Sequence, residues 1–473
     1  MKFKTLPSIL IGAAMLIGAG AQAQWTQLGT GNDTIAAGSY DINTLCADPS
    51  GNIYAAGQFL DAGSNQYVAK WNGTTWAELG TGSSALSANG DISSICSDPS
   101  GNIYAGGHFT DAGGMAYVAK WNGSAWTELG GSSGFGATLV QSISSIASDA
   151  QGNIYAAGEI AFLSGSNIYY QVMKWDGTAW TTVGGASNAL NANNAITAMT
   201  VDASGNVYAT GNFTNGTIST GHPYLARFNG SSWSEVGAGS GALNIPFGDY
   251  GNTIAVSGSN VYVAGTFRDA GGKYYVAHYD GSTWSELGGT ASFGAGVLDN
   301  PVKSVVVDGS GNVYAAGELI DANTAHSVVE KWNGSSWSNF GHYDNLAQDN
   351  AGINTMIYAH NLWYVAGGNQ NTSGSRFVAK YDGQGSNNAI SELDGHTMTV
   401  YPNPMSNLFN VRFDQSITAT ISVTDVTGQQ VATAELNDQA ATQIHTGSFA
   451  AGIYLVKVTT ATGATQTLKL VKE

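Results

Sequence analysis

Short runs of alternating apolar and polar residues, separated by turn-forming residues, recur along the chain. In one unit the runs are separated by Asp98–Asn102, Asp111–Gly114 and Asn122–Gly123. Glycine and asparagine accept the positive φ of tight turns, so each run is predicted to be a strand that pairs with the next. The four predicted strands are Ile92–Cys96, Ile103–Phe109, Tyr117–Trp121 and Trp126–Leu129.

This unit repeats along the chain around an Asn-x-Tyr core. The cores begin at Asn52, Asn102, Asn153, Asn206, Asn260, Asn312 and Asn361, which are 49 to 54 residues apart. That period is typical of four-stranded propeller blades. Small residues fill the second strand, as in Ala105-Gly106-Gly107, whereas bulky pairs such as Trp121 and Trp126 follow farther out. Radial sheets converge at the axis and diverge at the rim, so this gradient favours a propeller over a stacked solenoid.

The seventh unit stops after Val378–Gly383, without the Trp-x-x-Leu-Gly strand that ends the other units. The missing strand is present at Trp25–Gly29, near the other end of the chain. Pairing it with the last unit closes the ring and removes an open sheet edge. The predicted fold is therefore all-β: a seven-bladed β-propeller at 24–383, closed by the N-terminal strand, followed by a small antiparallel β-sandwich.

The chain is acidic, with 16 basic and 33 acidic residues and a formal net charge of −17. Such a surface repels nucleic-acid phosphates and anionic lipid headgroups, so no nucleic-acid partner is expected. The negative charge is explained either by a need for solubility or by attraction of cations. Cys46 and Cys96 occupy the same repeat position, where buried small residues are expected and where disulfide geometry is hard to reach.

The two ends of the chain read as targeting segments. Residues 1–23 combine Lys2 and Lys4, an apolar run and Ala21-Gln-Ala23, which predicts a cleaved signal peptide. The apolar run is short for a membrane span, and no transmembrane segment is expected in the mature chain. Residues 384–396 lose the repeat pattern and are predicted to be a linker. Alternating segments between turn residues predict a small sandwich at 397–473.

This tail resembles the C-terminal sorting domain of the type IX secretion system of Bacteroidota. The resemblance rests on Tyr401, Pro402, Asn403 and Pro404, then Asp425 and Gly428, then Gly452 and Tyr454 in Gly-Ile-Tyr-Leu-Val-Lys-Val, and a basic last strand. It implies that the type IX machinery carries the protein from the periplasm across the outer membrane, with release or surface attachment. An ordinary accessory sandwich is the alternative. The repeats resemble secreted bacterial repeat families and, more distantly, kelch-like blades, which implies a fold but no particular activity.

Most recurring residues are expected to build the blades. Asp48, Asp98, Asp149, Asp202 and Asp308 precede the first turn, where an aspartate accepts backbone N–H bonds. The sequence has no EF-hand loop or histidine pair at ligand spacing, so no metal and no cofactor are predicted. The tryptophan pairs are expected to pack between blades, with stacking on sugars as the alternative.

One position is polar but differs from unit to unit. It is occupied by Gln58, His108, Glu159, Asn212, Thr266, Glu318 and Asn369. By symmetry these residues, here called the polar ring, are predicted to lie near the loop-rich face, either reading a ligand or satisfying loop backbone. Phe135, Phe247, Phe293 and Tyr343 interrupt the loops, either as stacking platforms or as caps on the core.

No catalytic residue is predicted. Glu159 and Glu318 are candidates for a glycosidase carboxylate pair, which needs a separation of roughly 5–10 Å, but they lie three units apart. No Gly-x-Ser-x-Gly motif is present. The leading hypothesis is an exported or surface propeller that binds a glycan or a protein. A secreted polysaccharide-active enzyme and a structural surface protein are the alternatives.

Overall fold

The computed structural model contains two compact units, Gln24–Gly383 and Gln384–Glu473, which are described separately. The structure describes residues 25–29, 35, 37–38, 40–131, 134–137, 139–215, 221–238, 243, 245–246, 248–288, 293, 297–298, 300–321, 326–340, 352–371, 374–381, 391–393, 396–401, 405, 408–450 and 452–472. The predicted signal peptide at 1–23 and most of the predicted linker lie outside these residues. Among the described residues, no helix has the length and apolarity needed to cross a membrane.

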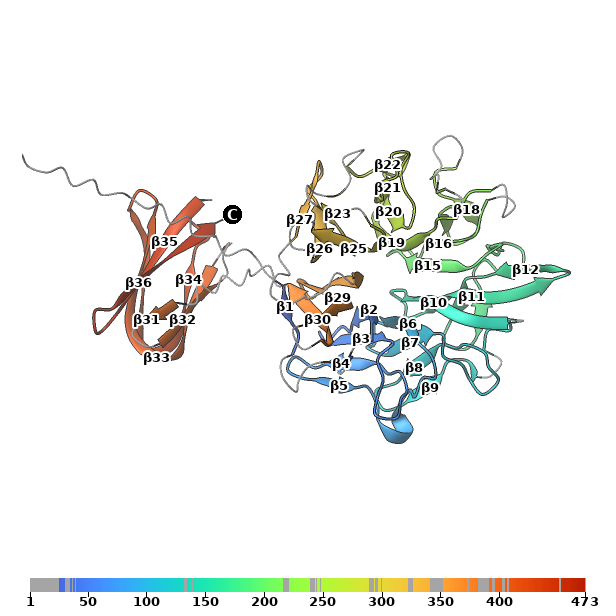
Figure 1. Cartoon of the computed structure of the whole chain (residues 1–473), viewed down its shortest axis with the longest axis horizontal. Helices are drawn as coiled ribbons and strands as arrows, with labels where there is room; N and C mark the ends of the chain where they lie inside the picture. The colour runs from blue at the N-terminus through green and yellow to red at the C-terminus, as the bar shows by residue number, and fades with distance from the viewer. Residues whose placement is uncertain are drawn as a thin grey trace, which may run out of the picture. The chain divides into compact units, whose positions relative to one another are not determined.

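Antiparallel four-stranded sheets dominate the larger unit (Figure 1). A representative sheet contains β6 (Ile92–Ser97), β7 (Ile103–Gly107), β8 (Ala119–Trp121) and β9 (Trp126–Glu128), in that order. The four predicted strands of this unit are confirmed, although the second ends two residues earlier and the third begins two residues later than predicted, and the ends of the first and the fourth shift by one residue. One more cross-strand bond follows the last residue of the second strand, from the His108 N–H to the Asp91 carbonyl at 2.8 Å.

The other sheets repeat this order, with an extra strand in two of them. The first two are β2 (Ile42–Ala47), β3 (Ile53–Gly57), β4 (Ala69–Trp71) and β5 (Trp76–Glu78), then β10 (Leu139–Ser148), β11 (Ile154–Ser164), β12 (Asn167–Tyr170), β13 (Met173–Trp175) and β14 (Trp180–Thr182). The next two are β15 (Ile196–Val201), β16 (Val207–Gly211), β17 (Ala226–Phe228) and β18 (Trp233–Glu235), then β19 (Gly251–Ser257), β20 (Asn260–Gly265), β21 (Ala277–Tyr279) and β22 (Trp284–Glu286). The next is β23 (Val297–Leu298), β24 (Val302–Val307), β25 (Val313–Asp321), β26 (Ser327–Trp332) and β27 (Trp337–Asn339). In the two sheets with an extra strand, β12 pairs with β11, and both β23 and β24 pair with β25. A 3-10 turn, η2 (Gly82–Ser84), lies between β5 and β6.

The remaining sheet of this unit joins strands from both ends of it. Its order is β1 (Thr26–Gln27), β30 (Arg376–Tyr381), β29 (Leu362–Gln370) and β28 (Ile353–Ala359). Thr26 lies opposite Lys380, and the Leu28 N–H donates to the Val378 carbonyl at 2.8 Å. The N-terminal strand therefore supplies the outer strand of the sheet that ends the unit.

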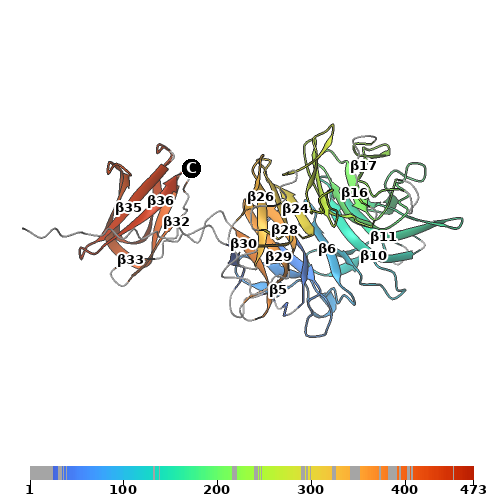
Figure 2. The ribbon, with the colours of Figure 1, turned by 45° about the horizontal axis from the view of Figure 1, so that its top comes forward.

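The core of this unit lies between neighbouring sheets. Tyr54 and Ala56 of β3 pack with Ile92 and Ile95 of β6 in one apolar cluster. Small residues in the second strands allow this close approach: a Cβ on Gly106 would lie 2.6 Å from Ile143 Cγ2 of the next sheet. Figure 2 shows the sheets side by side, with β11 and β12 extending beyond their neighbours.

The cysteines occupy this core. Cys46 and Cys96 are free thiols. Burial raises the pKa of both thiols, and the nearby Cys96 and Asp48 raise that of Cys46 further. A protonated thiol in an apolar cluster behaves as a small hydrophobic residue.

The smaller unit differs from the predicted sandwich. Its strands form one curled sheet, a half-barrel, in the order β31-β32-β33-β35-β36, with β34 also paired to β33. The strands are β31 (Ser391–Leu393), β32 (His396–Tyr401), β33 (Leu408–Asp425), β34 (Gln430–His445), β35 (Gly452–Thr460) and β36 (Thr465–Lys472).

The length of β33 explains the half-barrel. Its first half pairs with β32 and its second half with β35, while β34 follows it along most of its length. Register shifts between Arg412 and Ala419 bend β33 across the sheet, and bulges of this kind increase local twist. The curled sheet encloses Phe409, Phe413 and Ile421 on its concave side without a second sheet. β31 also falls within the segment predicted to be a linker.

Candidate functional site

Five polar-ring residues occupy equivalent places in their sheets. Each backbone N–H donates to the carbonyl of the residue just before the first strand. The donors and acceptors are Gln58 and Asp41, His108 and Asp91, Asn212 and Ala195, Thr266 and Tyr250, and Glu318 and Pro301, at 2.8–3.1 Å. Glu159 follows Gly158, which lies opposite Ile143 as Gly57 lies opposite Ile42. The position is therefore a fixed point of the backbone in each sheet.

Asn369 does not share this position, so its assignment to the polar ring was wrong. Gly367 lies opposite Ile353, and the Gly368 N–H donates to the Gly352 carbonyl at 3.1 Å. Gly368 is thus the equivalent residue. Asn369 comes one residue later, is 5% exposed and accepts a bond from the Ser327 hydroxyl at 3.1 Å. The mismatch arises in the sequence. Ala105-Gly-Gly follows Tyr104 directly, whereas Val365 separates Tyr364 from the Ala-Gly-Gly triplet that precedes Asn369.

Four ring side chains, those of Gln58, His108, Thr266 and Glu318, bind neighbouring protein groups. Gln58 Nε2 donates to Asp91 Oδ2 at 3.1 Å, and His108 Nδ1 lies 3.4 Å from Ser93 Oγ. Glu318 Oε1 forms an ion pair with Lys303 Nζ at 3.1 Å. These contacts match the alternative in which ring residues satisfy local polar groups. The structure gives Glu318 a cationic partner in its own sheet, whereas Glu159 belongs to β11, and no recorded contact joins the two acids.

The ring positions of the β15–β18 and β19–β22 sheets converge on a pocket. The pocket has a volume of about 230 Å³ and is lined by Asn194, Asn212, Thr214, Pro223, Asp249 and Tyr250, together with Gly248. Asn212 lines it directly. Thr266 fixes the backbone of the lining residue Tyr250: Thr266 Oγ1 accepts the Tyr250 N–H at 3.0 Å, and the Thr266 N–H donates to the Tyr250 carbonyl. The sequence reasoning identified Asn212 and Thr266 but missed Asn194, Asp249 and Tyr250.

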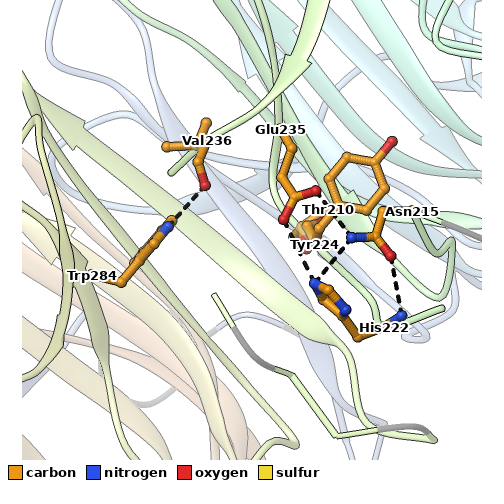
Figure 3. Close-up of polar contacts among 7 residues, drawn as sticks. All are labelled: Thr210, Asn215, His222, Tyr224, Glu235, Val236 and Trp284. Carbon is orange, nitrogen blue, oxygen red and sulfur yellow. Dashed lines mark hydrogen bonds and ion pairs between the residues drawn. The ribbon is translucent and has the colours of Figure 1, made fainter. Parts of the chain in front are cut away.

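One wall of this pocket continues into a polar cluster on the outer strands. Thr214 and Pro223 form an isolated antiparallel bridge, and the next residues, Asn215 and His222, are joined by a backbone bond at 3.2 Å. Figure 3 shows Asn215, His222 and Glu235 grouped together. Asn215 Nδ2 donates to Glu235 Oε2 at 3.1 Å, and His222 Nε2 lies 3.6 Å from Glu235 Oε1. This cluster ties the pocket wall to β18.

Other sheets place an aspartate where Asn215 stands, beside the equivalent glutamate. Burial and the charge of Asp61 raise the pKa of Glu78, and burial and Asp111 raise that of Glu128. Burial, followed by the charge and a hydrogen bond of Asp269, raises the pKa of Glu286 to about 6.

The carboxyl pairs also line cavities. One cavity of about 260 Å³ includes Asp111 and Glu128, and another of about 420 Å³ includes Asp269 and Glu286. Each pair therefore lines a half-open cavity, where one carboxyl retains its proton more readily than in water.

Replacing Glu286 with glutamine is expected to stabilise the protein above pH 6. The raised pKa means that the stability contribution of Glu286 is complete below its ordinary value of 4.5 and is lost as the pH rises through about 6. Glutamine mimics the protonated acid, so we expect a gain of about 1 kcal/mol at pH 8, after discounting for partial exposure. Denaturation curves from pH 4 to 8 would measure it. Glu235→Gln, next to Asn215, should show no such gain, and a gain that is independent of pH would contradict the assignment.

The recurring aspartates form turns, as predicted. Asp149 Oδ1 accepts the Gln151 and Asn153 N–H groups, and Oδ2 accepts Asn153 Nδ2 at 2.6 Å and the Tyr155 hydroxyl at 3.1 Å. Asp48, Asp98, Asp202 and Asp308 repeat the pattern. Within the described part of the chain, no group of three or more His, Cys, Asp or Glu side chains is arranged to hold a metal ion.

The tryptophans pack between sheets, as predicted. The indole N–H of each outer-strand tryptophan donates to a carbonyl of the preceding sheet at 2.7–3.1 Å. The pairs are Trp25 and Phe340, Trp76 and Leu28, Trp126 and Leu79, Trp180 and Leu129, Trp233 and Val183, Trp284 and Val236, and Trp337 and Leu287. Phe135 and Phe293 are buried against Trp180 and Trp337 and cap the core. Phe247 and Tyr343 lie outside the described residues.

The described motif residues of the tail build its sheet. Tyr401 ends β32 opposite Asn410. Asp425 accepts the Thr427 and Gln429 N–H groups in a turn that Gly428 completes at φ 85°. Gly452 begins β35, and the Tyr454 hydroxyl donates to the Ala450 carbonyl at 2.7 Å. Pro402, Asn403 and Pro404 lie outside the described residues.

Comparison with known structures finds neighbours at low sequence identity. PorZ, an essential surface component of the type IX secretion system of Porphyromonas gingivalis, is 16% identical with a TM-score of 0.48. The aligned part covers 95% of this chain but 60% of the PorZ chain. The β-propeller domain of the Trilobed protease from Pyrococcus furiosus is 8% identical over 73% of this chain and 96% of that chain, with a TM-score of 0.48.

The family comparison concerns the tail. No curated protein matches the chain. Residues 399–473 match the family described as the secretion system C-terminal sorting domain, which supports export to the cell surface or the extracellular space.

Proposed function

We propose that the protein is a seven-bladed β-propeller that binds a glycan or protein ligand outside the cell, after delivery by the type IX secretion system. The single observation that carries the delivery is the sorting-domain match at 399–473. In this proposal, residues 1–23 are a signal peptide that leads to the periplasm, and the type IX machinery then recognises the tail. Membership of the Bacteroidota, whose secretion system the tail resembles, is part of the same proposal.

Closure of the propeller is supported by the sheet that contains β1. Each outer-strand tryptophan bonds to the preceding sheet, and Trp25 makes the corresponding bond to Phe340 at 3.1 Å. On the other side, Arg376 Nε bonds to Asp41 Oδ1 at 3.2 Å, and Asn354 Nδ2 donates to the Ile42 carbonyl. These contacts join β28 and β30 to β2, so the last sheet contacts the first.

Binding through the polar-ring face is supported by the difference between the constant and the variable positions of the repeats. The recurring aspartates and tryptophans are engaged in turns and inter-sheet bonds, and are therefore poor ligand contacts. The side chain at the ring position varies while its backbone is held by the same hydrogen bond in sheet after sheet. A constant scaffold that presents variable polar groups is typical of binding surfaces.

Deleting the tail tests the delivery. A chain that ends at Gly383 should accumulate in the periplasm of the native host, whereas the full chain should appear at the surface or in the medium. Quantitative immunoblots of the cell fractions would measure this. An Asn212→Ala variant that retains the tail should be exported normally. Export of the truncated chain at the full-length level would overturn the proposal.

A further inference from the structure

The pocket between the β15–β18 and β19–β22 sheets has walls of mixed hydrogen-bonding character. The lining residues Asn194, Asn212, Thr214, Asp249 and Tyr250 carry amide, hydroxyl, carboxylate and phenol groups. Amides and hydroxyls both donate and accept, whereas the carboxylate only accepts when ionised. Within the described residues, no hydrogen bond from protein engages the Asn212 side chain, which is exposed. Its amide is therefore available to a ligand.

Internal bonds fix the walls of this pocket in place. The Asn193 side chain accepts the Thr214 N–H at 2.9 Å and donates to Thr214 Oγ1 at 3.0 Å. Asn194 Oδ1 accepts the Ala195 N–H at 2.8 Å, and Thr266 holds the Tyr250 backbone. Asn215, His222 and Glu235 anchor the same wall from the other side (Figure 3). A site with walls fixed before binding loses less entropy when it takes a ligand.

The charge and size of the pocket narrow the ligand class. Among the lining residues that the structure describes, Asp249 is the one charged side chain, so an anion is repelled. Among the described lining residues Asp249 supplies one carboxylate, and no group of three or more His, Cys, Asp or Glu side chains in the described chain is arranged to hold a metal ion. A volume of about 230 Å³ lies below the range of about 300–1,000 Å³ typical of drug-sized ligands and suits a single ring. Tyr250 and Pro223 add apolar surface on which the C–H face of such a ring can rest.

We propose that this pocket binds one neutral pyranose unit, whose hydroxyls bond to Asn212 and Asp249 and whose apolar face rests against Tyr250. The proposal deepens the proposed function and rests on it, because it names the ligand class and the place on the ring face. The other ring positions contribute less, since Gln58, His108 and Glu318 contact protein groups.

Binding of simple methyl glycosides to the purified full chain tests this proposal. The probes are the methyl glycosides of glucose, galactose, mannose and N-acetylglucosamine, with methyl glucuronide as the anionic counterpart. Saturation-transfer NMR titrations would give affinities. We expect at least one neutral glycoside to bind in preference to the glucuronide. Asn212→Ala and Asp249→Ala should each weaken it by about tenfold or more, since each removes a hydrogen-bonding group.

The matched control is Thr127→Ala, an exposed residue of β9 outside the polar ring, which should leave the affinity unchanged. Asn212 is exposed, so Asn212→Ala should keep the wild-type melting temperature. Binding that survives both pocket variants, or no saturable binding of any neutral glycoside, would overturn the inference. In that case, surface display with binding of a protein partner would leave the proposed function standing. Retention of the full chain in the periplasm would instead defeat the proposed function, whatever the sugar result.

Discussion

Trp25→Ala is expected to lower the free energy of unfolding by about 3–5 kcal/mol, the range for a large buried aromatic residue. Trp25 is 2% exposed, and its ring centroid lies 5.3 Å from that of Tyr381. Its indole N–H also donates to the Phe340 carbonyl at 3.1 Å. The substitution therefore removes the packing that holds β1 against β30. Urea denaturation of the full chain would measure the loss.

A second measurement distinguishes loss of the β1–β30 pairing from a general loss of stability. Hydrogen exchange in Arg376–Tyr381 should accelerate in Trp25→Ala, because β1 covers the edge of β30. Trp126→Ala removes a similar bond, to the Leu79 carbonyl, in a sheet formed by consecutive strands, and should leave exchange in β30 unchanged. Equal acceleration of hydrogen exchange in β30 by both variants would contradict a specific role of the N-terminal strand in protecting β30.

Asp149→Ala is expected to cost about 3 kcal/mol, because it removes several hydrogen bonds to a charged group and leaves buried partners unsatisfied. Asp149 is 7% exposed, and its partner Tyr155 is 4% exposed. Burial opposes ionisation of Asp149, but the bonds from Asn153, Tyr155 and Gln151 outweigh it and lower its pKa. Thermal and chemical denaturation would measure the loss.

The pH dependence gives this prediction its control. Because the pKa of Asp149 is lowered, its contribution is present above its ordinary value of 3.8 and is lost as the pH falls further. Asp149→Asn keeps one acceptor and should cost less than the alanine variant. The difference between wild type and Asp149→Asn should shrink towards low pH. A constant difference from pH 7 to pH 3 would show that the charge contributes nothing.

Local chemistry explains why the sheets could be predicted from the sequence. Asn122-Gly123 and the Asp98 turn specify where strands end, and alternation specifies which side chains are buried. The position of Trp25–Gly29 identified the strand that pairs with β30. The residue after Ala-Gly-Gly was used to locate the ring position, and this gave the wrong residue, Asn369, in the last sheet. Pairing between strands depends on the distance from the turn, and the triplet there begins one residue farther from the repeated tyrosine than the triplet at Ala105 does. In the tail, the shape depended on bends within β33, which alternation does not encode.

The pocket could be predicted only in part. Asn212 and Thr266 were identifiable because they vary at a repeated position. Asn194 and Tyr250 come just before the first strands of their sheets, where each supplies bonds that lock the local backbone. That location was a usable signal, but their approach to Asn212 depends on packing between two sheets. The same limit applies to Glu286, whose pKa is raised first by burial and then by Asp269 from the preceding turn.

Equilibrium binding of the full chain to a broad glycan array, with each bound glycan analysed for cleavage, tests the central claim most directly. The account predicts saturable binding to glycans with accessible neutral sugar units, with the bound glycan recovered intact. Cleavage of the bound glycan would contradict a binding module and favour the polysaccharide-active enzyme. Absence of binding to every glycan and to surface proteins tested alongside would favour a purely structural role.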